Sequence, residues 1–414
     1  MLTGTGSVPS SHVAAGSQTV TVGTLALTSG TGTASNYTLT GGTHSGTITT
    51  KALSLSGSRA YDGSTAFAAA AFGTSGTVST GIGTETVVLS GSGSVPDANV
   101  ASGSQTVIAG TLALANGTGT ASDYTLTGGT HSGTITTKAI SLSGSRAYDA
   151  STDFAAAAFG TNGTLSTGIG TETLLLTGTG SVPSSHVAAG SQTVSVGTLA
   201  LTSGTGTASN YTLTGGAHSG TITTKAISLS GSRSYDGSTA FAASAFGNSG
   251  TLSTGIGTET LILSGTGSVA DANVAAGSQT VIAGTLAIAS GSGTASNYTL
   301  TGGVHSGTIT TATLSVSADN QSRAYGTANP SFTHTITGYV NGETYATAGV
   351  TGSASSSTTA TSSSAAGSYP ITTSTGTLAA SNYSFSAVNG VLTVTSVSIA
   401  DSALPRLSNN EATP

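Results

Sequence analysis

The sequence predicts an all-β protein, built from tandem antiparallel domains of the β-sandwich type. Three observations predict this: an 87-residue repeat, runs in which apolar and polar residues alternate, and Gly-rich clusters between those runs. Alternation with a period of two marks half-buried strands. Short strands separated by turn residues every 8–12 residues or so are typical of sandwiches and barrels.

The repeat is visible at several residue types. Lys51, Lys138 and Lys225 are spaced by 87 residues, and Ala312 holds the next equivalent position. The same spacing separates four histidines and four tyrosines: His44, His131, His218 and His305, and Tyr37, Tyr124, Tyr211 and Tyr298. Ser-Ser-His also alternates with Asp-Ala-Asn along the repeats, ending at His12, Asn99, His186 and Asn273. Residues 2–20 recur verbatim at 176–194, so a two-repeat block was duplicated.

The period predicts the following domains: a partial repeat at 1–50, complete repeats at 51–137, 138–224 and 225–311, a related domain at 312–397, and a linker or tail at 398–414. Residues 1–50 correspond only to the latter part of a repeat. We therefore expect Met1 not to be the natural beginning of the array. Neighbouring domains are expected to touch only at short junctions, as beads on a string.

In the second repeat the alternation predicts strands near 52–57, 65–72, 86–95, 104–114, 123–129 and 132–137. The run from Phe67 to Phe72 is ambiguous, because its four Ala residues favour helix. We expect a strand there, although a short helical turn would also fit. The Tyr124-type tyrosines recur beside Asn or Asp, and we expect each ring to be buried against the penultimate strand of its domain.

Composition excludes several function classes. Charged residues make up 5% of the chain, against about 25% in ordinary globular proteins. Eight Lys and Arg side chains cannot form the cationic patch that nucleic acids or anionic membranes require. The absence of Cys excludes disulfides and thiolate metal sites. No apolar run is long enough to predict a membrane span, and no signal peptide is visible at the start.

Tyr-Asp-Gly or Tyr-Asp-Ala is the most regular candidate motif, at Tyr61–Gly63, Tyr148–Ala150 and Tyr235–Gly237. It could bind a ligand or form a turn, since Asp bonds the backbone two residues on and Gly tolerates positive φ. Ala150 occupies the Gly position in one of the three motifs. A position that accepts this replacement is more typical of a turn than of a ligand-binding site. Arg59 lies two residues before Tyr61 and would share a strand face with it, so an internal cation–π contact between these two residues or an Arg59–Asp62 pair is expected.

One histidine per repeat suggests a metal site, but no second ligand recurs with it, and we expect no zinc. Calcium-loop, P-loop and G-x-S-x-G motifs are absent from the sequence. We therefore predict no catalytic, cofactor-binding or metal-binding residues and no cofactor. The protein is not expected to be an enzyme.

The Tyr-Asp-Gly motifs, each followed by Ser-Thr, and the later Asn-Tyr-Thr-Leu and Ile-Thr elements resemble the signature of YDG-domain repeats. Ala324-Tyr325-Gly326, Asn329-Pro330 and Gly367–Ile371 resemble an MBG domain. Departures are Ala150 and the junction lysines, where many relatives have Pro. The resemblance implies a large secreted bacterial adhesin of the filamentous-haemagglutinin type, exported by two-partner secretion. It implies an extracellular place at the bacterial cell surface. The implied partners are neighbouring domains of a longer chain and host or biofilm surface ligands.

The predicted function is a non-catalytic repeat stalk, which spaces a binding domain from the cell. Two alternatives stay open. The first is a glycan- or ice-binding surface made of pairs such as Thr19/Thr21 and Thr47/Thr49. The second is a parallel β-helix, the body of some haemagglutinins, which would need a rung-sized repeat of roughly 20–30 residues within the 87. The sequence does not indicate the adhesive target, the organism or the length of the parent protein.

Overall fold

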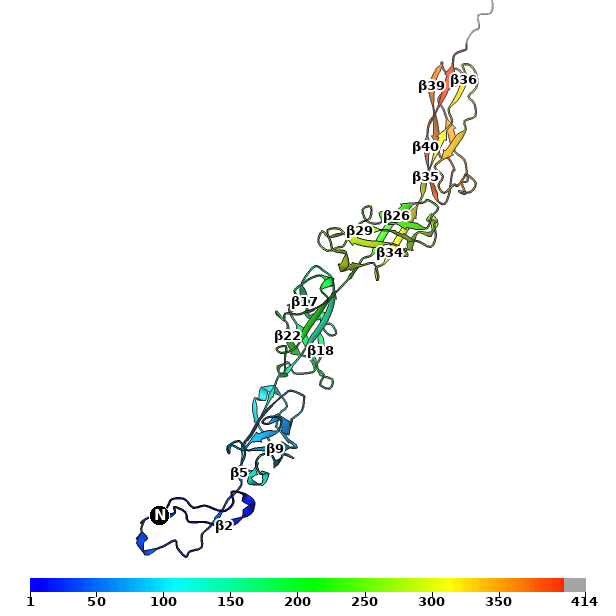
Figure 1. Cartoon of the computed structure of the whole chain (residues 1–414). Helices are drawn as coiled ribbons and strands as arrows, with labels where there is room; N and C mark the ends of the chain where they lie inside the picture. The colour runs from blue at the N-terminus through cyan, green and yellow to red at the C-terminus, as the bar shows by residue number, and fades with distance from the viewer. Residues whose placement is uncertain (398–414) are drawn as a thin grey trace, which may run out of the picture. The chain divides into compact units, whose positions relative to one another are not determined.

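The computed structural model describes residues 1–397, and within that range it contains strands and 3-10 turns but no α-helix (Figure 1). Small sheets of two to four strands recur along the chain and form tandem β domains. The predicted all-β class is confirmed. The predicted linker or tail at 398–414 lies outside the described residues.

The elements recur with the sequence repeat. The first repeat contains β1 (Leu2–Thr3), η1 (Val13–Ala15), β2 (Ser17–Thr19), β3 (Ala26–Leu27), η2 (Ala34–Asn36) and β4 (Ser45–Thr47). The second contains β5 (Lys51–Ala52), β6 (Leu55–Ala60), β7 (Ala66–Ala68), η3 (Ala69–Ala71), β8 (Thr77–Ser79), β9 (Thr86–Ser90), β10 (Ser92–Ser94), η4 (Val100–Ser102), β11 (Ser104–Thr106), β12 (Ala113–Asn116), η5 (Ala121–Asp123), β13 (Tyr124–Thr125) and β14 (His131–Thr136).

The third and fourth repeats follow the same order. The third contains β15 (Lys138–Ala139), β16 (Leu142–Ala147), β17 (Asp153–Ala155), η6 (Ala156–Ala158), β18 (Thr164–Ser166), β19 (Thr173–Thr177), β20 (Thr179–Ser181), η7 (Val187–Ala189), β21 (Ser191–Thr193), β22 (Ala200–Ser203), η8 (Ala208–Asn210), β23 (Tyr211–Thr212) and β24 (His218–Thr223). The fourth contains β25 (Lys225–Ala226), β26 (Leu229–Ser234), β27 (Ala240–Ala242), η9 (Ala243–Ala245), β28 (Thr251–Ser253), β29 (Thr260–Ser264), β30 (Thr266–Ser268), η10 (Val274–Ala276), β31 (Ser278–Thr280), β32 (Ala287–Ser290), η11 (Ala295–Asn297), β33 (Tyr298–Thr299) and β34 (His305–Thr310).

Backbone contacts divide the chain into two compact units, and each takes in parts of more than one repeat. One unit is Met1–Arg146, Ser151–Ser185 and Ala189–Ile222, and the other is Ala147–Ala150, His186–Ala188 and Thr223–Pro414. Every side-chain contact described below lies within one of these units. The domain boundaries at residues 51, 138, 225 and 312 stay a prediction.

The second repeat shows how each repeat closes on itself. β14 pairs antiparallel with β11 and parallel with β6, in the register His131 to Leu55. β13 likewise runs parallel to β5. β12, β9 and β8 form a separate antiparallel sheet. The end of the repeat thus returns beside its beginning, so the sheets are mixed and not purely antiparallel. Separate small sheets within one repeat also differ from the continuous rungs of a parallel β-helix.

The core of the second repeat is centred on two phenylalanines. Phe67 and Phe72 are fully buried, with ring centroids 5.8 Å apart. A Cβ at Gly133 would lie 2.9 Å from the Phe67 ring, so only Gly allows the ring to cross β14. The expected strand at 65–72 exists only in its first half, because η3 follows β7. A strand would direct residues five apart to opposite faces, and the helical turn brings both rings into the core.

β8 was not anticipated by the sequence analysis. Its three residues contain one apolar side chain, Val78, which is buried. A single apolar residue gives no periodicity, so the strand could not be recognised from the alternation.

The last domain closes in the same way as the repeats. Its strands are β35 (Ala312–Ala318), β36 (Gln321–Ala324), β37 (His334–Thr337), β38 (Ser355–Ser357), β39 (Gly367–Ser374), β40 (Tyr383–Val388) and β41 (Gly390–Thr395). β40 pairs parallel with β35, and the two lie side by side in Figure 1. β41 pairs parallel with β36. Ile371, Leu392, Ala360 and Ala318 form its buried cluster.

The first repeat is the exception. It has only two two-stranded sheets, β1 with β3 and β2 with β4. Its Tyr37 is 69% exposed, whereas the equivalent Tyr124 is 6% exposed. Residues that belong to the core in the other repeats are therefore exposed in residues 1–50.

The predicted burial of the tyrosines is confirmed for Tyr124, Tyr211, Tyr298 and Tyr383, which are all 6% exposed or less. We expect Tyr211→Ala to lower the free energy of unfolding by about 3 kcal/mol, because a buried ring leaves a cavity when truncated. Chemical denaturation followed by circular dichroism measures this. Tyr37→Ala is the matched control and should change it by less than about 0.5 kcal/mol. Equal effects of the two substitutions would contradict the assignment of the core.

Candidate functional site at the Tyr-Asp-Gly turns

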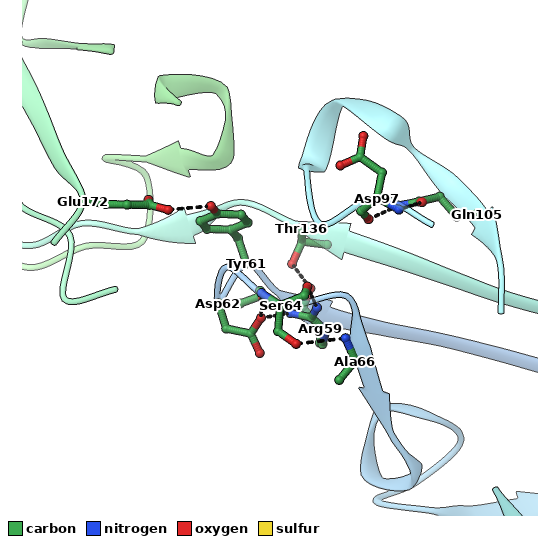
Figure 2. Close-up of polar contacts among 10 residues, drawn as sticks. Arg59, Tyr61, Asp62, Ser64, Ala66, Asp97, Gln105, Thr136 and Glu172 are labelled. Carbon is green, nitrogen blue, oxygen red and sulfur yellow. Dashed lines mark hydrogen bonds and ion pairs between the residues drawn. The ribbon is translucent and has the colours of Figure 1, made fainter. Parts of the chain in front are cut away.

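Asp62 closes the Tyr-Asp-Gly turn of the second repeat. Its Oδ1 accepts a hydrogen bond from the Ser64 backbone N–H at 2.9 Å and pairs with Arg59 Nη1 at 2.5 Å (Figure 2). Gly63 has φ +77°, in the left-handed region. The predicted turn and the predicted Arg59–Asp62 pair are confirmed.

Arg59 connects the turn with the core residue Phe67. Its guanidinium lies 5.1 Å from the centroid of the Phe67 ring and donates a hydrogen bond to the Ser64 carbonyl. The cation–π contact was expected with Tyr61; the structure instead places the Arg59 guanidinium over Phe67. Arg146 over Phe154 and Arg233 over Phe241 repeat it at the same distance.

Tyr61 points away from its own turn, toward a side chain of the third repeat (Figure 2). Its hydroxyl donates a hydrogen bond to Glu172 Oε1 at 2.9 Å. The other oxygen of Glu172 accepts the hydroxyl of Tyr211. The Tyr61 and Tyr211 rings meet edge to face, with centroids 5.3 Å apart. One carboxylate is thus shared by two phenols from consecutive repeats, an arrangement that we call the Tyr–Glu–Tyr contact.

The Tyr–Glu–Tyr contact recurs at the next two junctions. It consists of Tyr148, Glu259 and Tyr298, and then of Tyr235, Glu343 and Tyr383. The first hydroxyl lies 2.9 Å and 2.7 Å from its carboxylate, and the ring pairs are 5.3 Å and 5.4 Å apart. Tyr61, Tyr148 and Tyr235 are each at most 7% exposed. The contact is therefore a regular feature of the repeats.

A second contact joins the same repeats. The fully buried Asn210 accepts the Val100 backbone N–H at 2.9 Å and donates to Asn99 Oδ1 at 2.8 Å. We call this the Asn contact. Its equivalents use Asp123 with His12 and Val13, Asn297 with His186 and Val187, and Asn382 with Asn273 and Val274. The alternation of Ser-Ser-His with Asp-Ala-Asn in the sequence therefore falls on the residues that meet the next repeat.

The first Asn contact carries charge. Asp123 Oδ2 lies 2.6 Å from His12 Nδ1. The hydrogen bond between them raises the pKa of His12 and lowers the pKa of Asp123. Both groups favour their charged forms here, so this contact is strongest in weakly acidic solution.

In the two motifs that contain Gly, a side chain at this position would meet the neighbouring repeat as well as strain the turn. A Cβ on Gly63 would lie 2.9 Å from Ile169 Cγ2, and one on Gly237 would lie 2.7 Å from Asn341. Ala150 occupies the equivalent position with φ +66°. A left-handed conformation costs an Ala residue about 1–2 kcal/mol.

Sequence reasoning did not single out the glutamates of these contacts. Glu85, Glu172 and Glu259 are spaced by 87 residues in a chain with few charges, and this spacing was the signal that could have found them. The partner of each Tyr61-type residue lies more than 100 positions away. No local pattern indicates that distance.

The repeated histidines are bonded to backbone. Nε2 of His44, His131, His218 and His305 pairs with the carbonyl five residues earlier, at 2.8–3.0 Å. Among residues 1–397, no group of three or more His, Cys, Asp or Glu side chains could hold a metal ion. No helix in the same range is long and apolar enough to cross a membrane.

A similar shallow groove recurs in the first three repeats. It has a volume of about 350–440 Å³ and is lined in the third repeat by Leu199, Leu201, Tyr211 and Leu213. Comparable grooves lie beside Leu112 and Leu25. The threonines considered in the sequence are exposed, but β2 and β4 bring only the pairs Thr19–Ser45 and Ser17–Thr47 together in the first repeat.

Comparison with known families identifies two domain types. Residues 218–310 match the model of the YDG domain, and similar repeats lie earlier in the sequence. Residues 314–393 match the model of the MBG domain (YGX type). Neither is an enzyme family, and both are repeat domains typical of bacterial surface proteins. No curated protein and no solved structure matches the chain.

The Gly position of the motif gives a matched pair of substitutions. Gly63→Ala should lower the free energy of unfolding by about 2 kcal/mol, because it adds both left-handed strain and a clash with Ile169. Ala150→Gly should raise it by about 1 kcal/mol, because it removes the strain. Urea denaturation of both variants measures the difference. Changes of the same sign in both would contradict the assignment.

The Tyr–Glu–Tyr contact should also lose its stabilising effect at alkaline pH. Burial and the bond to Glu172 raise the pKa of Tyr211 to about 12; burial and the bond to Glu259 do the same for Tyr298. For Tyr235 the hydrogen bond to Glu343 is the larger cause and burial the second, and together they raise the pKa to about 12. Because the unfolded pKa is about 10, the stabilisation is fully present below pH 10 and is lost as the pH rises toward 12.

Ultraviolet titration of the tyrosines, with circular dichroism at each pH, measures this. We expect a late-ionising group whose titration accompanies loss of the folded signal, and Tyr211→Phe should reduce that group. Complete tyrosine ionisation below about pH 11 with an intact folded signal would refute the prediction.

Proposed function

We propose that this chain is part of the non-catalytic repeat stalk of a large secreted bacterial adhesin. In this proposal it lies outside the cell, at the cell surface, and spaces a binding domain from it. Its partners are the neighbouring domains of a longer chain, with host or biofilm surface ligands bound elsewhere on that chain. Two-partner secretion is the proposed route of export.

The observation that carries the proposal is the Tyr–Glu–Tyr contact together with the Asn contact. Both join a repeat to the one that follows it in the sequence. Proteins whose repeats contact successive neighbours gain length by adding copies, without redesign of a common core. A spacer needs this property, and the duplicated two-repeat block shows that copies were added.

Composition also supports the proposal. The chain has no Cys, so it can cross a membrane unfolded without premature crosslinking. Its surface is dominated by Ser, Thr and Gly and carries few charges. Such a surface offers little for electrostatic binding.

The second candidate function is direct ligand binding by the repeats. The recurring groove beside Leu112 and Leu199 is the observation that favours it. The polar residues that line it in the third repeat are Ser209, Tyr211, Thr212 and Thr214, none of them charged, and specific small-molecule sites depend on a few precisely placed polar or charged groups for orientation. Binding on a glycan array that is lost with Leu199→Glu would favour this alternative over the stalk.

Small-angle X-ray scattering tests the spacer. A compact protein of this length would have a radius of gyration of about 22 Å. We expect a clearly larger value and an elongated distance distribution. A variant with Glu172→Gln, Glu259→Gln and Glu343→Gln should broaden that distribution, because each substitution weakens a contact between repeats. A radius near the compact value would rule out the spacer.

A further inference from the structure

The second repeat, the fourth repeat and the last domain each close by a parallel pairing between an early strand and a late strand. The pairs are β6 with β14, β26 with β34, and β35 with β40, of which the last two are labelled in Figure 1. We propose that each pair is a load-bearing clamp, which resists tension applied along the chain. This inference rests on the proposed stalk and adds a function to it, because the domains then transmit force as well as provide length.

The parallel direction of the strands decides how tension acts on the clamp. In the second repeat the chain enters β6 at Leu55 and leaves β14 at Thr136, and these residues lie at opposite ends of the paired strands. Tension on the repeat therefore slides β6 along β14 and stretches the hydrogen bonds between them together. If the two strands were antiparallel, both load points would lie at the same end, and the bonds would break one after another.

The clamp of the second repeat is longer than its two strands. Six residue pairs join β6 to β14, from Leu55 with His131 to Ala60 with Thr136. Beyond the last pair, the Tyr61 backbone N–H donates a hydrogen bond to the Thr136 carbonyl at 2.8 Å. Before the first pair, β5 runs parallel to β13 and continues the same closure. Sliding the strands therefore requires many hydrogen bonds to be lost at once.

The fourth repeat and the last domain have the same construction. Six residue pairs join β26 to β34, and six join β35 to β40. In the last domain four further pairs join β36 to β41, again in parallel. The Tyr235 N–H donates to the Thr310 carbonyl at 2.8 Å, and the Tyr325 N–H donates to the Thr395 carbonyl at 2.9 Å, as Tyr61 does in the second repeat. The clamp therefore occurs in both domain types.

Aromatic rings cover the backbone of the clamp. Gly57 of β6 and Gly133 of β14 are paired with each other. A Cβ on Gly57 would lie 2.7 Å from the Phe72 ring, and one on Gly133 would lie 2.9 Å from the Phe67 ring. Both rings are fully buried. Because water competes for hydrogen bonds that are being stretched, this cover raises the force that the clamp resists.

Tension passes from one clamp to the next through the main chain. β14 ends at Thr136 and β15 of the next repeat begins at Lys138, where it runs parallel to β23. β34 ends at Thr310 and β35 begins at Ala312. Within the second repeat, the sheet of β8, β9 and β12 lies between the two clamp strands in sequence. That sheet carries no tension while the clamp holds, so the clamp alone sets the resistance of the repeat.

Because the chain has no Cys, the direction of load can be chosen in an optical-tweezers experiment on the full chain. The exposed positions Ser54, Thr130 and Thr137 serve for attachment. Ser54→Cys with Thr137→Cys pulls the strands along each other, whereas Ser54→Cys with Thr130→Cys peels them apart from one end. We expect the first attachment to require at least about threefold more force, because the hydrogen bonds share the load.

The length released identifies the part that unfolds. Both attachments enclose most of the second repeat, so each should release on the order of 250 Å of chain. Equal unfolding forces for the two attachments would overturn the proposal.

Two core truncations separate the clamp from the overall stability of the repeat. Ile135 of β14 is 1% exposed and Leu89 of β9 is 4% exposed, so Ile135→Ala and Leu89→Ala should lower the free energy of unfolding in urea similarly. In the chain attached at Ser54→Cys and Thr137→Cys, Ile135→Ala should lower the unfolding force at least about twice as much as Leu89→Ala does. An equal loss of force in both variants would refute the clamp, because force would then follow overall stability.

The results for the clamp and for the spacer are distinguishable. An elongated chain by scattering, whose second repeat unfolds at the same force in both directions, would retain the spacer and refute the clamp. A compact radius of gyration with a force that depends on direction would refute the spacer and support the clamp.

Discussion

The arrangement of this protein depends on a carboxylate that accepts hydrogen bonds from two tyrosine hydroxyls, one from each of two consecutive repeats. Glu172 receives Tyr61 from the second repeat and Tyr211 from its own. Other features follow from the need to place Tyr61 there. Arg59 and Asp62 close the turn that presents it, and Gly63 lets the turn approach Ile169. Hydrogen bonds to a charged group are stronger than those between neutral groups, so few side chains are enough.

A contact of so few side chains is enough to join two repeats, because each repeat is stabilised by its own core. The parallel pairing of β14 with β6 brings the last strand beside the second strand and encloses Phe67 and Phe72. A polar junction also leaves an unpaired face soluble, whereas a broad apolar face would promote aggregation. The apolar residues thus stabilise the repeat itself, and the tyrosines and glutamates join it to the next repeat.

The sequence predicted those features that depend on local periodicity or on burial. The all-β class, the Tyr-Asp-Gly turn and the buried Tyr211 all follow from patterns within one repeat. Strand direction did not follow, because alternation is the same for parallel and antiparallel neighbours. The helical half of the Phe67–Phe72 run was also not expected, since only packing of both rings decides it. The role of Glu172 depends on a partner 111 positions away, which no short pattern encodes.

The parallel closure of each repeat has a consequence for folding. During folding the last strand, β14, must pair with β6 of its own repeat, although nearly identical strands occur in the other repeats. Pairing with one of those strands would exchange halves between domains. The alternation of Ser-Ser-His with Asp-Ala-Asn makes adjacent repeats less alike than repeats two apart. The copies most similar in sequence are therefore never neighbours along the chain. During synthesis, each repeat can close before its nearest duplicate emerges.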